Sequence, residues 1–283
     1  MNDVKKKISP LELHTSILVY MVATSVYNNY LHSTGKHNVW ISAIISIFIG
    51  LFYVFIYISL SSIYPNKTII KINDIIFGRY IGKLISVIYI FVFSAMLLDT
   101  MVWSSFLLEE SIAPDSSRIF AIILITVFSL IAIKNGIQPV IRYALVLVVL
   151  GYVVLGVTYV LLLKDMDFSN LLPIDVPIKD ILKGSLLHVD YTYGESIYFF
   201  LIIFPGFNNI KNILHEKKKY VYFTVIFGGL FTILAFVRNA AIIGNLSILY
   251  RYYYLNVVRN IEIGEARLEL LFILENISFL FFF

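Results

Sequence analysis

The feature that most constrains this chain is a series of apolar runs, each close to 20 residues long and nearly free of charge. A helix of about 20 residues crosses the roughly 30 Å of hydrocarbon in a bilayer. Runs of this length therefore predict membrane-spanning α-helices. We expect eight spans of roughly the length that a bilayer requires, at 11–31, 39–63, 84–108, 118–134, 140–163, 185–205, 220–243 and 266–283.

Composition excludes the main alternatives. Of the 283 residues, 59% are hydrophobic and 14% are charged, whereas soluble domains carry about 45–50% apolar and about 25% charged residues. A transmembrane β-barrel would alternate polar and apolar residues in segments of about 10, but these runs are continuous. There is no cysteine, which excludes disulfides and thiolate chemistry. The sequence predicts an all-α integral membrane protein.

The N-terminal run has two possible readings, a signal peptide or a first span. Signal peptides have a short apolar core and a small-residue cleavage site. The run at 11–31 is longer, and further runs follow it, so we interpret it as the first span. Lysines at 5–7 precede it, and most other basic residues fall in the segments on the same side. The positive-inside rule then predicts a cytoplasmic N-terminus.

Five charged residues fall inside apolar runs, where charge is costly and commonly functional. They are Asp99, Asp190, Glu195, Arg238 and Glu275. A purely structural role is also open for three of them. It would be an ion pair or polar helix contact for Asp99, snorkelling to the outer interface for Arg238, and a boundary position for Glu275.

The sequence contains none of the common catalytic or nucleotide-binding motifs in a credible context. His32 and His37 lie five residues apart but lack a third ligand, so we interpret them as interfacial histidines rather than a metal site. We predict no enzyme activity, no cofactor and no metal.

Two spans look interrupted. In the sixth, Asp190-Tyr191-Thr192-Tyr193-Gly194-Glu195 forms a polar stretch inside an apolar run. In the first, Ala23-Thr24-Ser25 and Tyr27-Asn28-Asn29-Tyr30 are comparably polar. Transporters break helices near the midplane so that free backbone groups and side chains hold a polar ligand. For the first span, the alternative is that its polar end is simply the outer interface.

Short motifs along almost the whole chain carry a family resemblance. They are Ile8-Ser9-Pro10-Leu11, Tyr64-Pro65-Asn66-Lys67-Thr68, Phe77-Gly78-Arg79-Tyr80-Ile81-Gly82-Lys83, Asn170-Leu171-Leu172-Pro173, Lys183-Gly184-Ser185, Tyr193-Gly194-Glu195 and Phe204-Pro205. In order and spacing the chain resembles the spore germination permease family, the membrane B subunits of nutrient germinant receptors, which are relatives of the amino acid/polyamine/organocation transporters.

The resemblance implies a LeuT-like inverted-repeat helical bundle of about ten helices in a single transmembrane domain. Residues 1–163 would form the first five-helix repeat and 185–283 an incomplete second one. It also implies A and C partner subunits, the spore inner membrane and a small nutrient germinant such as an amino acid. The implied ligand-binding residues are Thr24, Ser25, Asn28, Asp99, Tyr191, Tyr193, Gly194 and Glu195.

The sequence departs from the family pattern in three places. The segment Ser25–Tyr30 lacks the family's glycines and proline, and Thr192-Tyr193 stands where the family favours proline before Gly-Glu. We also expect eight spans where the resemblance implies about ten helices, so we expect a truncated variant, a frameshifted product or a degenerate paralogue. The alternatives to a receptor subunit are a proton- or sodium-coupled amino acid transporter and a non-functional paralogue.

Overall fold

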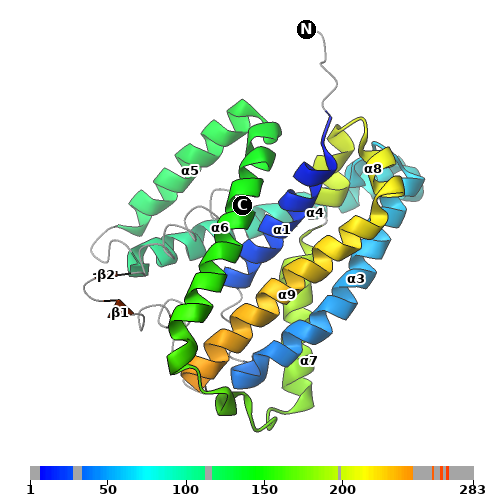
Figure 1. The fold of residues 1–283 in the computed structure, drawn as a ribbon. Helices are drawn as coiled ribbons and strands as arrows, with labels where there is room; N and C mark the ends of the chain where they lie inside the picture. The colour runs from blue at the N-terminus through cyan, green and yellow to red at the C-terminus, as the bar shows by residue number, and fades with distance from the viewer. Residues whose placement is uncertain are drawn as a thin grey trace.

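A computed structural model describes residues 7–27, 34–111, 117–196, 199–244, 257, 262–263 and 266–267. Long α-helices dominate these residues (Figure 1). The α-helices are α1 (Pro10–Tyr27), α3 (Val39–Ile63), α4 (Ile69–Ser111), α5 (Arg118–Asn135), α6 (Ile137–Leu162), α7 (Ile178–Val189), α8 (Ile210–Glu216) and α9 (Lys218–Ile243).

Shorter elements connect these helices. The 3-10 turns are η2 (Lys36–Asn38), η3 (Leu163–Asp165), η4 (Phe168–Leu171) and η7 (Phe204–Gly206), and the π-helical turns are η5 (Asp190–Gly194) and η6 (Phe199–Ile203). Two strands, β1 (Glu262–Ile263) and β2 (Ala266–Arg267), pair antiparallel. The predicted eighth span was to begin at 266, but the backbone there is extended. The rest of that span lies outside the described residues.

Five described helices are long and apolar enough to cross a membrane: Lys36–Ile63, Ile69–Phe106, Arg118–Asn135, Ile137–Asp165 and Lys218–Ile243. These match predicted spans two to five and seven. Large apolar side chains on them face outward, including Phe91, 72% exposed, and Ile119, 69% exposed. Such surfaces are stable against lipid rather than water. The chain is therefore a multi-pass helical membrane protein, and the count of eight spans remains a prediction.

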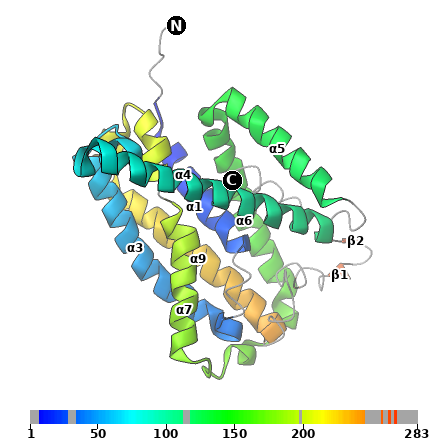
Figure 2. The same cartoon turned by 180° about the vertical axis from the view of Figure 1, so that it is seen from behind.

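Helix α1 lies at the centre of the bundle. It packs against α6 on one side and α9 on the other, and α3 packs against α9 and α7 (Figure 1). Gly228 allows α9 to approach α1 closely, since a Cβ there would lie 2.8 Å from the sulfur of Met21. Seen from behind, α4 runs across the bundle toward α5, its main packing partner (Figure 2).

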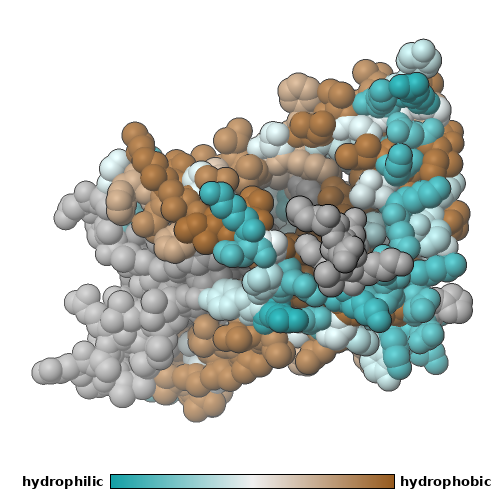
Figure 3. All heavy atoms as spheres, turned by 90° about the horizontal axis from the view of Figure 1, so that it is seen from above, coloured by the Kyte–Doolittle hydropathy of each residue, from teal (hydrophilic) through white to brown (hydrophobic). Residues whose placement is uncertain are grey.

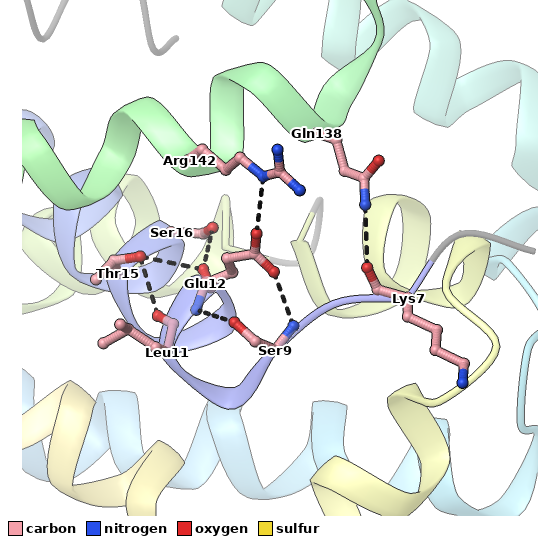
Figure 4. A network of polar contacts seen from close by, with 8 residues as sticks. All are labelled: Lys7, Ser9, Leu11, Glu12, Thr15, Ser16, Gln138 and Arg142. Atoms are coloured by element: carbon pink, nitrogen blue, oxygen red, sulfur yellow. Dashed lines mark hydrogen bonds and ion pairs between the residues drawn. The ribbon is translucent and has the colours of Figure 1, made fainter.

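The beginning of α1 is held by a network of polar contacts (Figure 4). Ser9 and Glu12 form a capping box: the Glu12 carboxylate accepts from the Ser9 N–H at 2.8 Å, and the Glu12 N–H donates to Ser9 Oγ at 3.1 Å. Arg142 of α6 pairs with Glu12 at 3.2 Å. The Asn209 side chain bonds the N–H and C=O of Ile8. Because these contacts join the starts of α1 and α6 to the chain before α8, all three meet at one end.

That end carries much of the charge. Lys211, Lys217, Lys218 and Lys219, around α8 and the start of α9, are exposed. The face seen from above in Figure 1 shows hydrophilic side chains gathered on the side of α8 (Figure 3). At the opposite end, the Asn38 amide donates to Leu171 O at 3.1 Å and the Asn170 amide to Ala241 O at 3.0 Å. The start of α3 and the end of α9 therefore meet there.

The two predicted interruptions turn out differently. The sixth span leaves α-helical geometry where the break was predicted: the α-helix ends at Val189 and continues as the π-helical turn η5 through Gly194, so the backbone is distorted there but stays helical. The first span is an unbroken α-helix through Tyr27, so the expected break at Thr24 and Ser25 is wrong. The Thr24 hydroxyl donates to Met21 O at 2.9 Å within the helix, which is compatible with helical backbone. Residues 28–30 lie outside the described part.

The third span begins earlier than predicted. Helix α4 starts at Ile69 rather than near 84 and contains a kink at Gly78, whose φ of 77° is a left-handed value. The kink joins a short helix to the long one, a backbone change that apolar length alone did not reveal.

Candidate functional site

A cavity of about 780 Å³ lies between α4 on one side and α1, α3 and η5 on the other. This volume falls in the range of about 300–1,000 Å³ that is usual for small-molecule sites. Its lining consists of Thr24, Tyr53, Tyr57, Ile85, Ile88, Tyr89, Val92, Phe93, Ala95, Met96, Asp99, Thr100, Trp103, Asp190, Tyr191, Gly194 and Glu195.

The π-helical turn η5 shapes one wall of the cavity. The Glu195 N–H donates to Asp190 O at 3.0 Å, five residues back. Single π turns of this kind are frequent at functional sites. A Cβ on Gly194 would lie 3.2 Å from an Asp190 carboxylate oxygen. The turn therefore brings Asp190, Gly194 and Glu195 to the same cavity.

Tyrosine hydroxyls from neighbouring helices bond the carbonyls of this turn. Tyr57 on α3 donates toward Tyr193 O at 3.2 Å and Gly194 O at 3.1 Å. Tyr20 on α1 donates toward Tyr191 O at 3.2 Å and the Glu195 carboxylate at 3.0 Å. The turn is thus tied to both helices.

Helix α1 makes a third contact with the turn through Thr24, whose hydroxyl lies 3.2 Å from that of Thr192. Both residues are buried, so this contact is shielded from solvent. Thr24 therefore belongs both to the cavity wall and to the packing of α1 on η5.

Five of the predicted ligand-binding residues line the cavity together: Thr24, Asp99, Tyr191, Gly194 and Glu195. They come from three separate segments of the chain. Asn28 lies outside the described residues, and so does the side chain of Ser25. Their predicted roles remain predictions.

Tyr193 lies elsewhere. Its ring is 1% exposed and fills a slot beside Gly50, where an added Cβ would lie 2.5 Å from three ring carbons. Its ring is also edge-on to that of His188. The π turn directs Tyr193 away from the cavity and into the α3–α9 packing, although its sequence neighbours line the cavity.

Sequence reasoning missed the aromatic part of the site. Tyr53 and Tyr57 come from α3, and Tyr89, Phe93 and Trp103 come from α4. The sequence did contain a signal: Tyr53 and Tyr57 are four residues apart, as are Tyr89 and Phe93, and residues at this spacing share a helix face. In such an apolar helix, that spacing did not distinguish cavity-facing from lipid-facing aromatic rings.

Arg238 does not lie at this site. It is 2% exposed within α9, and its guanidinium donates to Thr158 and Asn239. The expectation that it snorkels outward is wrong, because these buried acceptors satisfy its N–H groups. Glu275 lies outside the described residues. Among the described residues, no group of three or more histidine or acidic side chains is placed to hold a metal ion.

The fold and the site define a class: a multi-pass helical membrane protein with a ligand-sized cavity beside an interrupted helix. Residues 7–282 match the model of a family described as "Spore germination protein", and the chain belongs to that family.

Two relatives come from Bacillus subtilis (strain 168). Spore germination protein KB is 24% identical over 276 residues, covering 95% of this chain and 73% of the relative. Spore germination protein YndE is 25% identical over 252 residues, covering 86% of this chain and 65% of the relative. The chain thus spans about two thirds to three quarters of the length of these relatives. No solved structure matches it.

Proposed function

We propose that this chain is the membrane subunit of a spore nutrient germinant receptor and that the 780 Å³ cavity binds the germinant. The proposal places it in the spore inner membrane with its N-terminus in the cytoplasm, acting with A and C subunits. A small nutrient such as an amino acid would bind against η5 and shift a conformational equilibrium that the partner subunits detect.

The observation that carries the proposal is the convergence of α1, α3, α4 and η5 on one cavity. A ligand drives a conformational switch only if it binds two states differently. Contacts to η5 meet this requirement, because the turn is bonded to Tyr20 and Tyr57 on two separate helices. A ligand that changes the turn would change the packing of η5 against both α1 and α3.

The proposal extends to the architecture. The packing of the π-helical turn of the sixth segment against α1 supports a LeuT-like inverted repeat, with 1–163 as the first repeat and 185–283 in the second, although α1 itself is unbroken through Tyr27. The exposed lysines near α8 support a cytoplasmic location for the end where α1 begins.

The experiment fills the cavity in spores whose germination depends on this chain. Ala95→Trp places an indole in the lining. Ser94→Trp is the matched control, because Ser94 is an exposed residue of α4 that does not line the cavity. We expect the first to abolish or strongly weaken the germinant response and the second to preserve it. Normal germination of the Ala95→Trp spores, with the protein present in their membranes, would refute the proposal.

A coupled transporter is the second candidate, because the carboxylates of Asp99, Asp190 and Glu195 share the cavity and acids at such depth serve in proton and ion pathways. Solute uptake into proteoliposomes containing only this chain would favour the transporter over the receptor.

A further inference from the structure

Among the described residues, the cavity lining contains acidic side chains and no basic ones. The carboxylates of Asp99, Asp190 and Glu195 all line it. Asp99 lies within the membrane-spanning helix α4, where a charge is screened less than in bulk water. Three acids in one cavity therefore favour a positively charged occupant.

The described lining supplies no positive charge to balance them: it contains no lysine, arginine or histidine. Arg238 is occupied by Thr158 and Asn239 and is not part of the lining. A ligand carboxylate would face the three acids without a cationic partner among the described residues. The lining therefore selects against anions and gives the carboxylate of a zwitterion no cationic partner.

The remaining walls suit an apolar cation. The rings of Tyr53, Tyr89, Phe93, Trp103 and Tyr191 face the same space. Aromatic faces attract ammonium groups and also bury apolar ligand surface. Glu195 is additionally oriented by the Tyr20 hydroxyl at 3.0 Å, so one acid is held in place at the end formed by η5.

From these observations we infer that the cavity takes a small organic cation, an ammonium group on an apolar body without a free carboxylate, with the ammonium directed at Glu195 and Asp190. The inference rests on the proposed function, because it assigns a ligand class to the same site. It narrows the germinant from small nutrients in general to amines, and so replaces the amino acid that the proposed function gives as an example.

The test compares ligands that differ only in charge. Phenethylamine, phenylalanine and 3-phenylpropionate share one apolar body, and 3-methylbutylamine, leucine and 4-methylpentanoate share another. The purified full chain is heated with each compound, and the rise in Tm is followed against concentration, since a ligand that prefers the folded state raises Tm. We expect the amine of each set to raise Tm most, the amino acid less, and the carboxylate not at all.

A variant pair locates the effect. Glu195→Gln should weaken amine binding by about tenfold or more, as expected for loss of a charge-assisted hydrogen bond. Asp165→Asn, which neutralises an exposed acid outside the lining, should leave the amine response unchanged. The inference is overturned if a carboxylate or amino acid stabilises the chain as well as its amine, if neither amine raises Tm, or if Glu195→Gln responds like wild type.

The two proposals fail in different ways. If Ala95→Trp blocks germination but the ligand series gives the wrong charge order, the cavity is the germinant site and only the ligand class is wrong. If Ala95→Trp spores germinate normally while the amines still bind through Glu195, the charge preference stands and the receptor role fails.

Discussion

Replacing Tyr57 with phenylalanine tests whether tyrosine hydroxyls hold the π-helical turn. The change removes one O–H donor that is shared between Tyr193 O at 3.2 Å and Gly194 O at 3.1 Å. It keeps the ring, which stacks on Phe200 with centroids 5.8 Å apart. Any effect therefore comes from the hydroxyl rather than from a lost apolar contact.

The expected loss of stability follows from the number of hydrogen bonds that the Tyr57 hydroxyl makes. One proton serves two acceptors, so about one hydrogen bond is lost. Interhelical hydrogen bonds in membranes contribute about 0.6 kcal/mol on average and up to about 1.7. The substitution leaves the Tyr193 and Gly194 carbonyls without this donor. We therefore expect the free energy of unfolding to fall by an amount near the upper part of that range, about 1–1.5 kcal/mol.

Tyr193→Phe is the matched control. It makes the same chemical change at a residue of η5 itself, but the Tyr193 hydroxyl is buried with no hydrogen-bond partner among the described residues. Removing it should be neutral or slightly stabilising, because an unsatisfied buried hydroxyl costs free energy.

The assay is reversible unfolding of each purified variant in detergent, together with its dose response to a stabilising amine. We expect Tyr57→Phe to lose both stability and ligand affinity, and Tyr193→Phe to lose neither. Equal destabilisation by the two variants would contradict the assignment of hydroxyl roles, as would a neutral Tyr57→Phe.

Three further predictions concern packing, capping and charge. Gly50→Ala should destabilise by about 1–3 kcal/mol through overpacking of the tyrosine slot, whereas Gly156→Ala, with open space around it, should be neutral or stabilising in unfolding assays. Ser9→Ala should cost about 1 kcal/mol by removing the α1 cap, measured in the same unfolding assays. The Ser169 side chain and N–H lower the pKa of Asp167, so its stabilisation is present at neutral pH and is lost as pH falls through that lowered pKa. The Tm difference between wild type and Asp167→Ala should therefore shrink in acid, and a constant difference would argue against this role.

The hydrogen bonds around η5 suggest how occupancy would reach the rest of the bundle. Tyr20 has one proton and two acceptors, Tyr191 O and the Glu195 carboxylate. A ligand ammonium that engages Glu195 would compete for this acceptor and favour donation to Tyr191 O instead. Binding would then alter the contact between α1 and the turn, a local change of the kind that a two-state element amplifies.

The sequence by itself determined the membrane character of the protein and the approximate positions of five long helices, although not the start of α4. Apolar length and the absence of alternation are enough for this, because a bilayer tolerates only backbone whose polar groups are satisfied within the segment. The polar stretch at 190–195 also indicated where the sixth segment leaves α-helical geometry. The family resemblance named five residues that line the cavity, which are Thr24, Asp99, Tyr191, Gly194 and Glu195.

Only the tertiary structure decided which side chains share the cavity. Tyr191 and Tyr193 are two residues apart, yet one lines the cavity and the other fills a slot at Gly50. Residues two apart lie on nearly opposite sides of a helix, so the two rings separate in any helical geometry, but only the packing of α3, α4 and α9 around η5 decides which ring faces the cavity. The aromatic wall on α4 was equally hidden, because lipid and cavity both accept the same apolar residues and only the position of α4 relative to α1 and α3 distinguishes the two environments.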